Sequence, residues 1–281
     1  MNKDLKKRIE LFANDIRRET AKEIAEIGVG HMGGTFSAAE VLAVLYEGIM
    51  KYDPNNPEWE YRDRFVLSKG HAGPALYAIL AMKGFFPMEW LLTLNKNGTN
   101  LPSHPDRLKT PGVDVTTGSL GQGLSVAAGV AMGMRFNGID SRVFVVCGDG
   151  ECNEGQIWEA AMFASHRKLN NLIVFVDRNL QQCDGFSDAI CDIGDVKKKF
   201  EAFDWFSLSV DGHSVEEIYD AVQLALKEKE KPSMIVLHTV KGKGASLFEG
   251  KRLNHNPTVS KEQLEICLRE INDARERILK D

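Results

Sequence analysis

The sequence predicts an α/β protein with a doubly wound, mainly parallel sheet that has helices on both faces. Two apolar runs, residues 143–147 and 172–176, are uninterrupted by polar residues. Such runs are typical of strands that are buried on both faces. The segment between them, residues 154–169, has the length and composition of a helix, which gives a β-α-β unit. We expect a single domain over residues 1–281 with a helical extension at its C-terminal end.

Length and composition limit the class of protein. A chain of 281 residues can bury one large α/β core, and 43% hydrophobic with 27% charged residues is ordinary for a globular protein. The net charge of −5 argues against a nucleic-acid partner, which would require a basic surface. No apolar stretch reaches the roughly 20 residues of a membrane span, and the amino terminus lacks a signal core. Five cysteines without CxxC spacing fit a reducing compartment, so we expect a cytoplasmic protein with no membrane partner.

The amino-terminal part predicts two helices around a glycine-rich turn. Apolar residues recur among charges over residues 5–27, which predicts an amphipathic helix ended by Gly28. A second helix is expected over residues 37–50, with Ser37 as its N-cap and Glu40 three residues later. The turn between them carries His31, and a lone histidine in such a turn is more often structural than catalytic.

The next three segments contain two more histidines and a second glycine-rich turn. A short strand over residues 62–68 leads to His71 at the start of a helix, where it could bind a phosphate or equally cap the turn. His104 lies in an irregular stretch over residues 95–117, and loops of that length are usually functional or disordered. The segment TTGSLGQG, residues 116–123, begins another helix, and its glycine spacing does not match the dinucleotide fingerprint.

Polar residues end the two buried strands of the β-α-β unit. Asp149 follows the first strand and Asn179 the second, so both should reach the carboxyl edge of the sheet, where open α/β folds bind ligands. Carboxylate and amide oxygens suit Mg²⁺, and a phosphate commonly completes its coordination. Gly150 leaves room for a diphosphate at the amino end of the following helix. The alternative is that these residues only form strand-ending turns, which the Gly-Asp-Gly tripeptide alone would favour.

The carboxyl-terminal part predicts two further strands and two helices. The strands are expected over residues 206–210 and 234–240, with a helix over 215–228 between them and a charged amphipathic helix over 260–280. The segment KGKG at residues 241–244 lacks the spacing of a P-loop. Histidines outside the glycine-rich segments are expected to be structural or turn residues: His166, His213 and His238.

The unit from Gly-Asp-Gly to Asn179, 30 residues after Asp149, resembles the signature of thiamine diphosphate enzymes. Within that group, the segment GDGECNEGQIWEAAMFAS is similar to transketolases. So are GHMGG followed by SAAEVLAVLY, and the segments SKGHAG and TTGSLGQG. The sequence departs from the family pattern where Met32 and Ser119 replace common prolines, and where Cys183 falls in the cofactor cleft.

The resemblance implies cofactors and roles for individual residues. The cofactors are thiamine diphosphate and Mg²⁺, or Ca²⁺ or Mn²⁺ in its place. The metal would be bound by the side chains of Asp149 and Asn179 and by the backbone carbonyl of Gln181. The residues that would act on the sugar substrate are His31, His104 and His255. The residues that would contact the cofactor are His71, Gly118, Leu120, Gly150, Glu154, Asn179 and His255, with Glu154 coupling two cofactor sites.

The resemblance also implies a partner chain. In transketolases the glutamate that binds the aminopyrimidine belongs to a pyrimidine-binding domain that follows the diphosphate domain. Because the similarity covers nearly all of the 281 residues and no such domain follows, we expect the N-terminal subunit of a split transketolase. A C-terminal subunit would supply that domain and the catalytic glutamate, with two copies of each chain in an α2β2 assembly. The reaction would transfer a two-carbon ketol unit from a ketose phosphate to an aldose phosphate.

Two other interpretations stay open at this point. One is another thiamine diphosphate enzyme, either similar to 1-deoxyxylulose-5-phosphate synthase or the alpha subunit of a 2-oxo acid dehydrogenase. These share the unit from Asp149 to Asn179, whereas the three glycine-rich segments favour transketolase. The other interpretation is a non-catalytic regulatory subunit that keeps the fold. The intact Asp149, Asn179 and histidines argue against it, because such residues have no evident packing value at the edge of a cleft.

Overall fold

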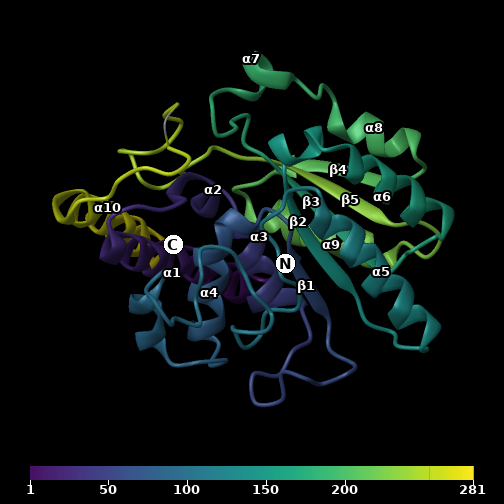
Figure 1. Ribbon diagram of the computed structural model, residues 1–281, viewed down its shortest axis with the longest axis horizontal. Coiled ribbons are helices and arrows are strands. Elements are labelled where there is room, and N and C mark those ends of the chain that lie inside the picture. The colour runs from purple at the N-terminus through teal and green to yellow at the C-terminus, as the bar shows by residue number, and fades with distance from the viewer. Residues whose placement is uncertain (253, 281) are drawn as a thin grey trace.

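The computed structural model describes residues 1–252 and 254–280, and within them five strands form one parallel sheet (Figure 1). The order across the sheet is β1-β2-β3-β5-β4, and every neighbouring pair is parallel. The strands are β1 Arg64–Leu67, β2 Val143–Gly148, β3 Leu172–Arg178, β4 Phe206–Asp211 and β5 Ser233–His238. The predicted β-α-β unit is confirmed as β2, α6 and β3.

Helices connect the strands and account for most of the remaining regular structure. The α-helices are α1 Lys3–Ile27, α2 Met32–Phe36, α3 Ala39–Ala43, α4 Gly73–Met82, α5 Gln122–Phe136, α6 Gly155–His166, α7 Ser187–Cys191, α8 Val196–Ala202, α9 Val215–Lys227 and α10 Lys261–Lys280. Among the described residues, none of these helices combines the length and apolar character that a membrane crossing requires.

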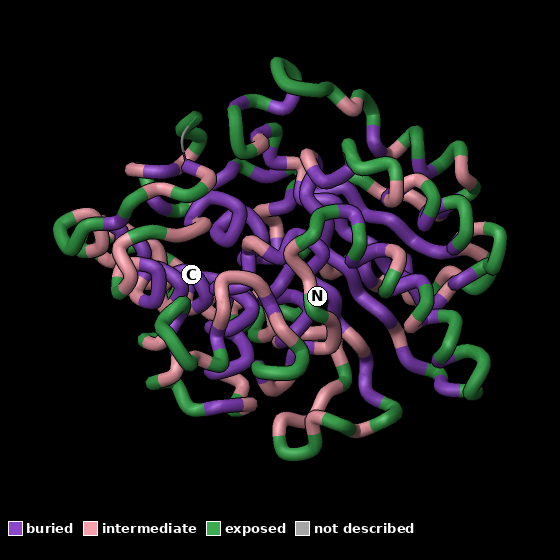
Figure 2. The backbone as a smooth tube through the Cα atoms, viewed as in Figure 1, coloured by how far each residue is buried: buried purple, intermediate pink, exposed green. Residues whose placement is uncertain are grey.

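Two hydrophobic cores lie on opposite faces of the sheet, which confirms the doubly wound fold. Successive side chains of a strand point to opposite faces. On β2, Phe144 and Val146 therefore pack into the core under α1 to α4 and α9, whereas Val143 and Val145 pack under α5, α6 and α8. Figure 2 shows the central strands β2 and β3 as buried, whereas the edge strand β4 is only partly buried and exposed residues are concentrated on the outer helices and loops. Burial on both faces explains why these strands are apolar at every position.

Several predicted boundaries are confirmed. Helix α1 ends at Gly28, whose φ of 82° is the left-handed conformation that a C-terminal glycine provides. Residues 95–117 contain no helix or strand, as the sequence predicted. Leu253, two residues before His255 in the segment LNHN, lies outside the described residues.

The helix predicted over residues 37–50 is wrong in its start and in its cap. Helical structure begins at Met32, turns at residues 37–38, resumes as α3 and continues into a π-helical turn, Val44–Ile49. The Ser37 hydroxyl does not cap this segment, because it donates to Asp177 Oδ2 at 2.7 Å. Glu40 instead accepts from Arg17. Contacts with distant parts of the chain therefore replace the local capping that the spacing suggested.

Candidate functional site

A cleft lies at the carboxyl ends of β2 and β3, where the predicted metal and cofactor residues meet. Asp149 and Gly150 follow β2, Asn179 follows β3, and the register of the two strands sets Gly148 opposite Asp177. The cleft is lined by eight of the predicted residues: His71, Leu120, Asp149, Gly150, Glu154, Asn179, Gln181 and His255.

Four histidines from four separate segments gather at one side of this cleft. The ring centroid of His31 lies 5.5 Å from that of His71, 6.0 Å from that of His104 and 5.1 Å from that of His255. Gly118 lies directly against His104, because a Cβ on this glycine would come within 3.1 Å of the imidazole Cγ. The structure thus brings together every residue that the sequence predicted for the site.

Burial keeps these four imidazoles uncharged near neutral pH. It lowers the pKa of His31 to about 4, with help from His104 and Lys241, and that of His255 to about 3, with help from Lys241. The pKa of His71 falls well below its usual value and that of His104 is lowered, in both cases mainly through burial. A neutral imidazole can donate from one nitrogen and accept at the other. The cluster can therefore both hydrogen-bond to a ligand and take up a proton.

Asp149 is buried without a cationic partner. Its carboxylate accepts from the backbone N–H of Gly150 at 2.8 Å and of Leu180 at 2.7 Å, and from the Ser187 hydroxyl at 3.4 Å. Among the described residues, no lysine, arginine or histidine forms an ion pair with it. Burial and the nearby Asp177 raise its pKa to about 6. A cation beside this carboxylate would favour its charged form.

The oxygen atoms around Asp149 fit a small divalent ion. The Asn179 amide lies beside it, with Nδ2 donating to Asp177 Oδ2 at 3.0 Å and Oδ1 accepting from Gln181 N at 3.1 Å. The carbonyl oxygen of Gln181 accepts from the Lys241 ammonium at 3.4 Å. This oxygen therefore already interacts with a positive charge in the cleft. Carboxylate, amide and carbonyl oxygens are the ligands that Mg²⁺ and Ca²⁺ prefer.

Lys69 and Asp177 form a buried ion pair that the sequence did not reveal. Their exposed fractions are 1% and 0%, and the Lys69 ammonium donates to Asp177 Oδ2 and to the Gly34 carbonyl. Hydroxyl groups of Ser37 and Thr239 also donate to Asp177. Burial alone would raise the pKa of Asp177, but Lys69 and these donors hold it below its usual value. This pair stabilises the floor of the cleft.

Lys241 is a second lysine of the cleft that the sequence did not single out. Its Nζ lies 3.1 Å from His255 Nδ1 and 3.3 Å from the Gln182 carbonyl. Burial and the charge of Lys69 lower its pKa to about 8, although Asp149 and Asp177 oppose this change. Its position directly after the last strand was the available signal, since ligand sites in parallel sheets lie at the carboxyl ends of strands.

Glu151 connects the two glycine-rich turns of the cleft. Its buried carboxylate accepts from the backbone N–H of Gly121 at 2.9 Å and of Gly148 at 3.0 Å, and from the Ser68 hydroxyl. Burial raises its pKa, which these donors partly offset. The loop that carries Leu120 is thereby held against the turn that carries Asp149.

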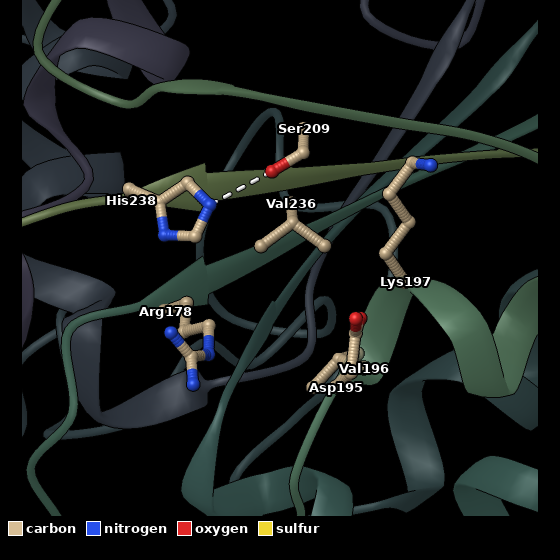
Figure 3. A pocket seen from close by; sticks show the side chains of 7 residues that line it. All are labelled: Arg178, Asp195, Val196, Lys197, Ser209, Val236 and His238. Atoms are coloured by element: carbon tan, nitrogen blue, oxygen red, sulfur yellow. Dashed lines mark hydrogen bonds between the residues drawn. The ribbon is translucent and has the colours of Figure 1, made fainter.

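A second hollow lies at the same edge of the sheet but on the face covered by α8. It is lined by Arg178, Lys197, Ser209 and His238, among others, and His238 Nε2 lies 2.7 Å from Ser209 Oγ (Figure 3). Asp177 and Arg178 are consecutive in β3, so their side chains point to opposite faces. His238, predicted to be structural, thus lies apart from the histidine cluster.

The outer surface of α5 and α6 exposes apolar side chains. Phe136 is 88% exposed, and the other large apolar residues exposed on these helices are Val126, Met132, Met162 and Phe163. Gly129 and Gly133 of α5 have no atom within 4 Å of the position that a Cβ would occupy. An exposed apolar surface of this kind is typical of a protein–protein contact.

Comparisons with known proteins identify a family and relatives that are themselves transketolase subunits. The family model described as the transketolase, thiamine diphosphate-binding domain matches residues 9–271. The chain is 52% identical over 259 residues to the 6-deoxy-6-sulfo-D-fructose transketolase subunit SqwG of Clostridium sp. (strain MSTE9), covering 92% of this chain and 94% of that protein. It is 37% identical over 273 residues to an apulose-4-phosphate transketolase subunit of Phocaeicola vulgatus, covering 97% of each.

The solved structures that match are longer chains. The crystal structure of transketolase from Campylobacter jejuni matches with a TM-score of 0.89 and 31% identity, over 99% of this chain and 46% of that one. The human transketolase is similarly 41% identical over 92% of this chain but only 41% of its own length. The chain therefore spans nearly all of the two subunit relatives and less than half of these two longer proteins.

Proposed function

This chain belongs to the transketolase family, and we propose that it is the N-terminal subunit of a split transketolase. The complete enzyme would transfer a two-carbon ketol unit from a ketose phosphate to an aldose phosphate. The observation that carries the proposal is the buried Asp149, which forms no ion pair among the described residues and lines one cleft with His71 and His255 of the histidine cluster. The similarity to two transketolase subunits over nearly their full length favours this function over the other thiamine diphosphate enzymes.

In this proposal the cofactor is bound through a metal ion. Mg²⁺ would be held by the side chains of Asp149 and Asn179 and by the carbonyl of Gln181, and Ca²⁺ or Mn²⁺ could occupy the same ligands. Gly150 lines the cleft and has no side chain, which supports a close approach of the diphosphate to its backbone. When bound, thiamine diphosphate supplies a thiazolium ring that acts as an electron sink for a carbanion.

The remaining cofactor contacts are proposed for residues at the walls of the cleft. His71 and Lys241 would hydrogen-bond the diphosphate, which favours the charged form of the Lys241 ammonium. Gly118 would contact the rings through its backbone and Leu120 through its apolar side chain. Glu154 lies against Gly121 at the rim, where a Cβ on that glycine would be 2.8 Å from Glu154 Cβ. This location supports contact between Glu154 and a neighbouring subunit.

His31, His104 and His255 are proposed to act on the sugar. Since burial keeps them neutral, each can donate a hydrogen bond to a substrate hydroxyl or carbonyl oxygen and can also accept a proton. An anionic ligand in the cleft would raise the pKa of these imidazoles, because their charged form then gains an attractive partner. Proton transfer by these residues therefore depends on a loaded cleft.

A partner polypeptide is proposed to cover α5 and α6. It would carry the pyrimidine-binding domain and the catalytic glutamate, and two copies of each chain would form an α2β2 assembly. The exposed Phe136 and the open glycines of α5 support close packing of another chain at this face. The five unpaired cysteines support a cytoplasmic assembly. In this proposal the assembly acts in carbohydrate metabolism, including that of pentose phosphates.

The test is reconstitution with the partner chain. The tagged protein is purified from its own cells with co-purifying polypeptides, and ketol transfer is measured with thiamine diphosphate and Mg²⁺. Donors should include ordinary ketose phosphates and 6-deoxy-6-sulfo-D-fructose, because a relative named for the latter is 52% identical to this chain. We expect transfer only when both chains are present and not when this chain carries Asp149→Asn. Transfer by the single chain, or none by any complex that it forms, would overturn the proposal.

A further inference from the structure

His213 does more than form the turn that the sequence predicted after β4. Its Nε2 accepts from the backbone N–H of Val240 at 2.8 Å, and its Nδ1 lies 3.1 Å from Glu40 Oε2. A backbone N–H can only donate, so Nε2 must be the unprotonated nitrogen. Nδ1 then carries the proton and donates to Glu40. These two bonds fix both the tautomer and the orientation of the ring.

Glu40 is itself held firmly by Arg17. Arg17 Nη2 donates to Glu40 Oε1 at 2.6 Å and Oε2 at 2.7 Å, and to the Phe36 carbonyl at 3.1 Å. Burial would raise the pKa of the Glu40 carboxyl, but Arg17 and His213 hold it below its usual value. The carboxylate is therefore charged at neutral pH. Arg17, Glu40 and His213 form a continuous chain of hydrogen bonds from α1 through α3 to the main chain at Val240.

Val240 precedes Lys241, whose side chain enters the cofactor cleft. The carbonyl of Lys241 is held from the other side, by Gly250 N at 2.9 Å and Asn254 Nδ2 at 3.1 Å. The bond from Val240 N–H to His213 fixes the Thr239–Val240 peptide, on the N-terminal side of Lys241. A lysine ammonium lies at the end of a flexible four-carbon stem, so its location depends on how well its main chain is held.

We propose that Arg17, Glu40 and His213 are positioning residues that fix the main chain at Val240 and thereby hold the Lys241 ammonium in the cleft. His213 lies outside the cleft, in a hollow under α1 and α10 that it shares with Arg17 and Glu40. It acts on the cofactor only through Lys241. The part of this inference that concerns cofactor binding rests on the proposed function.

The first test measures how firmly the main chain at Val240 is held in the protein without cofactor. The Val240 N–H donates to His213 Nε2 at 2.8 Å, so its hydrogen–deuterium exchange should be slow in the wild type. In His213→Ala this N–H loses its acceptor, and its exchange should become faster. Unchanged exchange at Val240 in His213→Ala would overturn the inference whether or not the chain binds thiamine diphosphate.

Two matched variants separate positioning from general damage. In His213→Gln the side-chain carbonyl can still accept from Val240 N–H, so exchange at Val240 should stay near that of the wild type. His238→Ala removes a histidine two residues before Val240 whose ring bonds Ser209 in the separate hollow (Figure 3). It should leave exchange at Val240 unchanged. Exchange that rises as much in His238→Ala as in His213→Ala would contradict the inference.

The second test is a double-mutant cycle on the complex with its partner chain. Thiamine diphosphate is titrated in the presence of Mg²⁺ into the wild type, His213→Ala, Lys241→Met and the double variant. We expect His213→Ala to weaken binding about tenfold, in the range seen when outer hydrogen-bond partners of a site are lost. It should have no further effect when Lys241 is already Met. Equal weakening in both backgrounds would show that His213 does not act through Lys241. A wild-type complex that fails to bind, with the exchange results at Val240 as expected, would refute the proposed function and leave the positioning of the main chain intact.

Discussion

Asp149 and Asp177 lie at the ends of two neighbouring strands, both buried, and differ in what compensates their charge. Asp177 is bound by Lys69, Ser37, Thr239 and Asn179, and its pKa is held below the usual value. Asp149 accepts from two backbone N–H groups and one distant hydroxyl, and burial raises its pKa to about 6.

The difference separates a structural carboxylate from a binding one. A buried charge is costly unless it is paired and hydrogen-bonded. The protein itself satisfies Asp177, which therefore stabilises the fold. Asp149 forms no ion pair among the described residues, and the nearby Lys69 only partly offsets the rise in its pKa. In the proposed function a divalent ion supplies the missing charge. Burial alone would not distinguish the two, because Asp149 is 4% exposed and Asp177 is 0% exposed.

The largest effect on stability is expected from Asp177→Asn. This change leaves the Lys69 ammonium buried without a counter-charge, which typically costs about 3–5 kcal/mol. Urea unfolding of the isolated variant should show a correspondingly lower free energy of unfolding. Asp140→Asn is a matched control, because its side chain is 95% exposed and its ion pair with Arg142 should contribute little. A fall of less than about 1 kcal/mol in Asp177→Asn would contradict the structural role.

The next effect is a pH dependence that Asp149 alone produces. Its folded pKa of about 6 lies above the ordinary 3.8, so its contribution to stability is present below about pH 4 and is lost as pH rises through 6. The difference corresponds to about 3 kcal/mol at 1.36 kcal/mol per pH unit. Without metal, the wild type should therefore lose stability relative to Asp149→Asn between pH 4 and 8. If the urea midpoints of the wild type and Asp149→Asn change in the same way between pH 4 and 8, the raised pKa of Asp149 is contradicted.

A smaller effect is expected from Lys241→Met. Binding of thiamine diphosphate by the complex should weaken about 10- to 100-fold, as expected for the loss of a charge-assisted bond worth roughly 1.5–3 kcal/mol. The free energy of unfolding should stay the same or rise, because burial already disfavours the charged amine. Lys197→Met, in the hollow of Figure 3, provides the control and should bind the cofactor normally. Calorimetric titration distinguishes these outcomes.

The smallest effect is expected from Glu151→Gln. The amide nitrogen cannot accept from a backbone N–H, so one of the bonds to Gly121 and Gly148 is lost at a cost of about 1–2 kcal/mol. The loop at residues 116–121 should then exchange its backbone hydrogens faster, which hydrogen–deuterium exchange can measure. Unchanged exchange in that loop would show that Glu151 does not hold it against the Asp149 turn.

The sequence was a good guide to features that depend on local pattern. The uninterrupted apolar runs of β2 and β3 predicted a sheet covered on both faces, and the residues after each run predicted the edge where Asp149 and Asn179 lie. His31 and His71 were found through glycine-rich segments that resemble a family, and His104 and His255 through resemblance of loop segments to the same family. These motifs can be recognised in the sequence because the residues that form a tight turn and the site residue that the turn carries are close together in the chain.

Pairings between distant residues could not be predicted in this way. Ser37 binds Asp177 across 140 positions and Lys69 binds it across 108. Contacts between residues so far apart in the chain produce no periodic pattern in the sequence. The spacing of Ser37 and Glu40 instead predicted a local helix cap. The role of His213 was missed for the same reason, since its partner Glu40 lies 173 positions earlier.

The most direct measurement is a titration of thiamine diphosphate into the complex of this chain with its partner, with and without Mg²⁺. We predict that the wild-type complex binds the cofactor tightly only when the metal is present. The complex with Asp149→Asn should bind weakly and equally in both conditions, while the variant chain stays folded. Metal-dependent binding that persists in Asp149→Asn, or wild-type binding that is equally tight without metal, would contradict the assignment of Asp149 as the carboxylate that holds the metal.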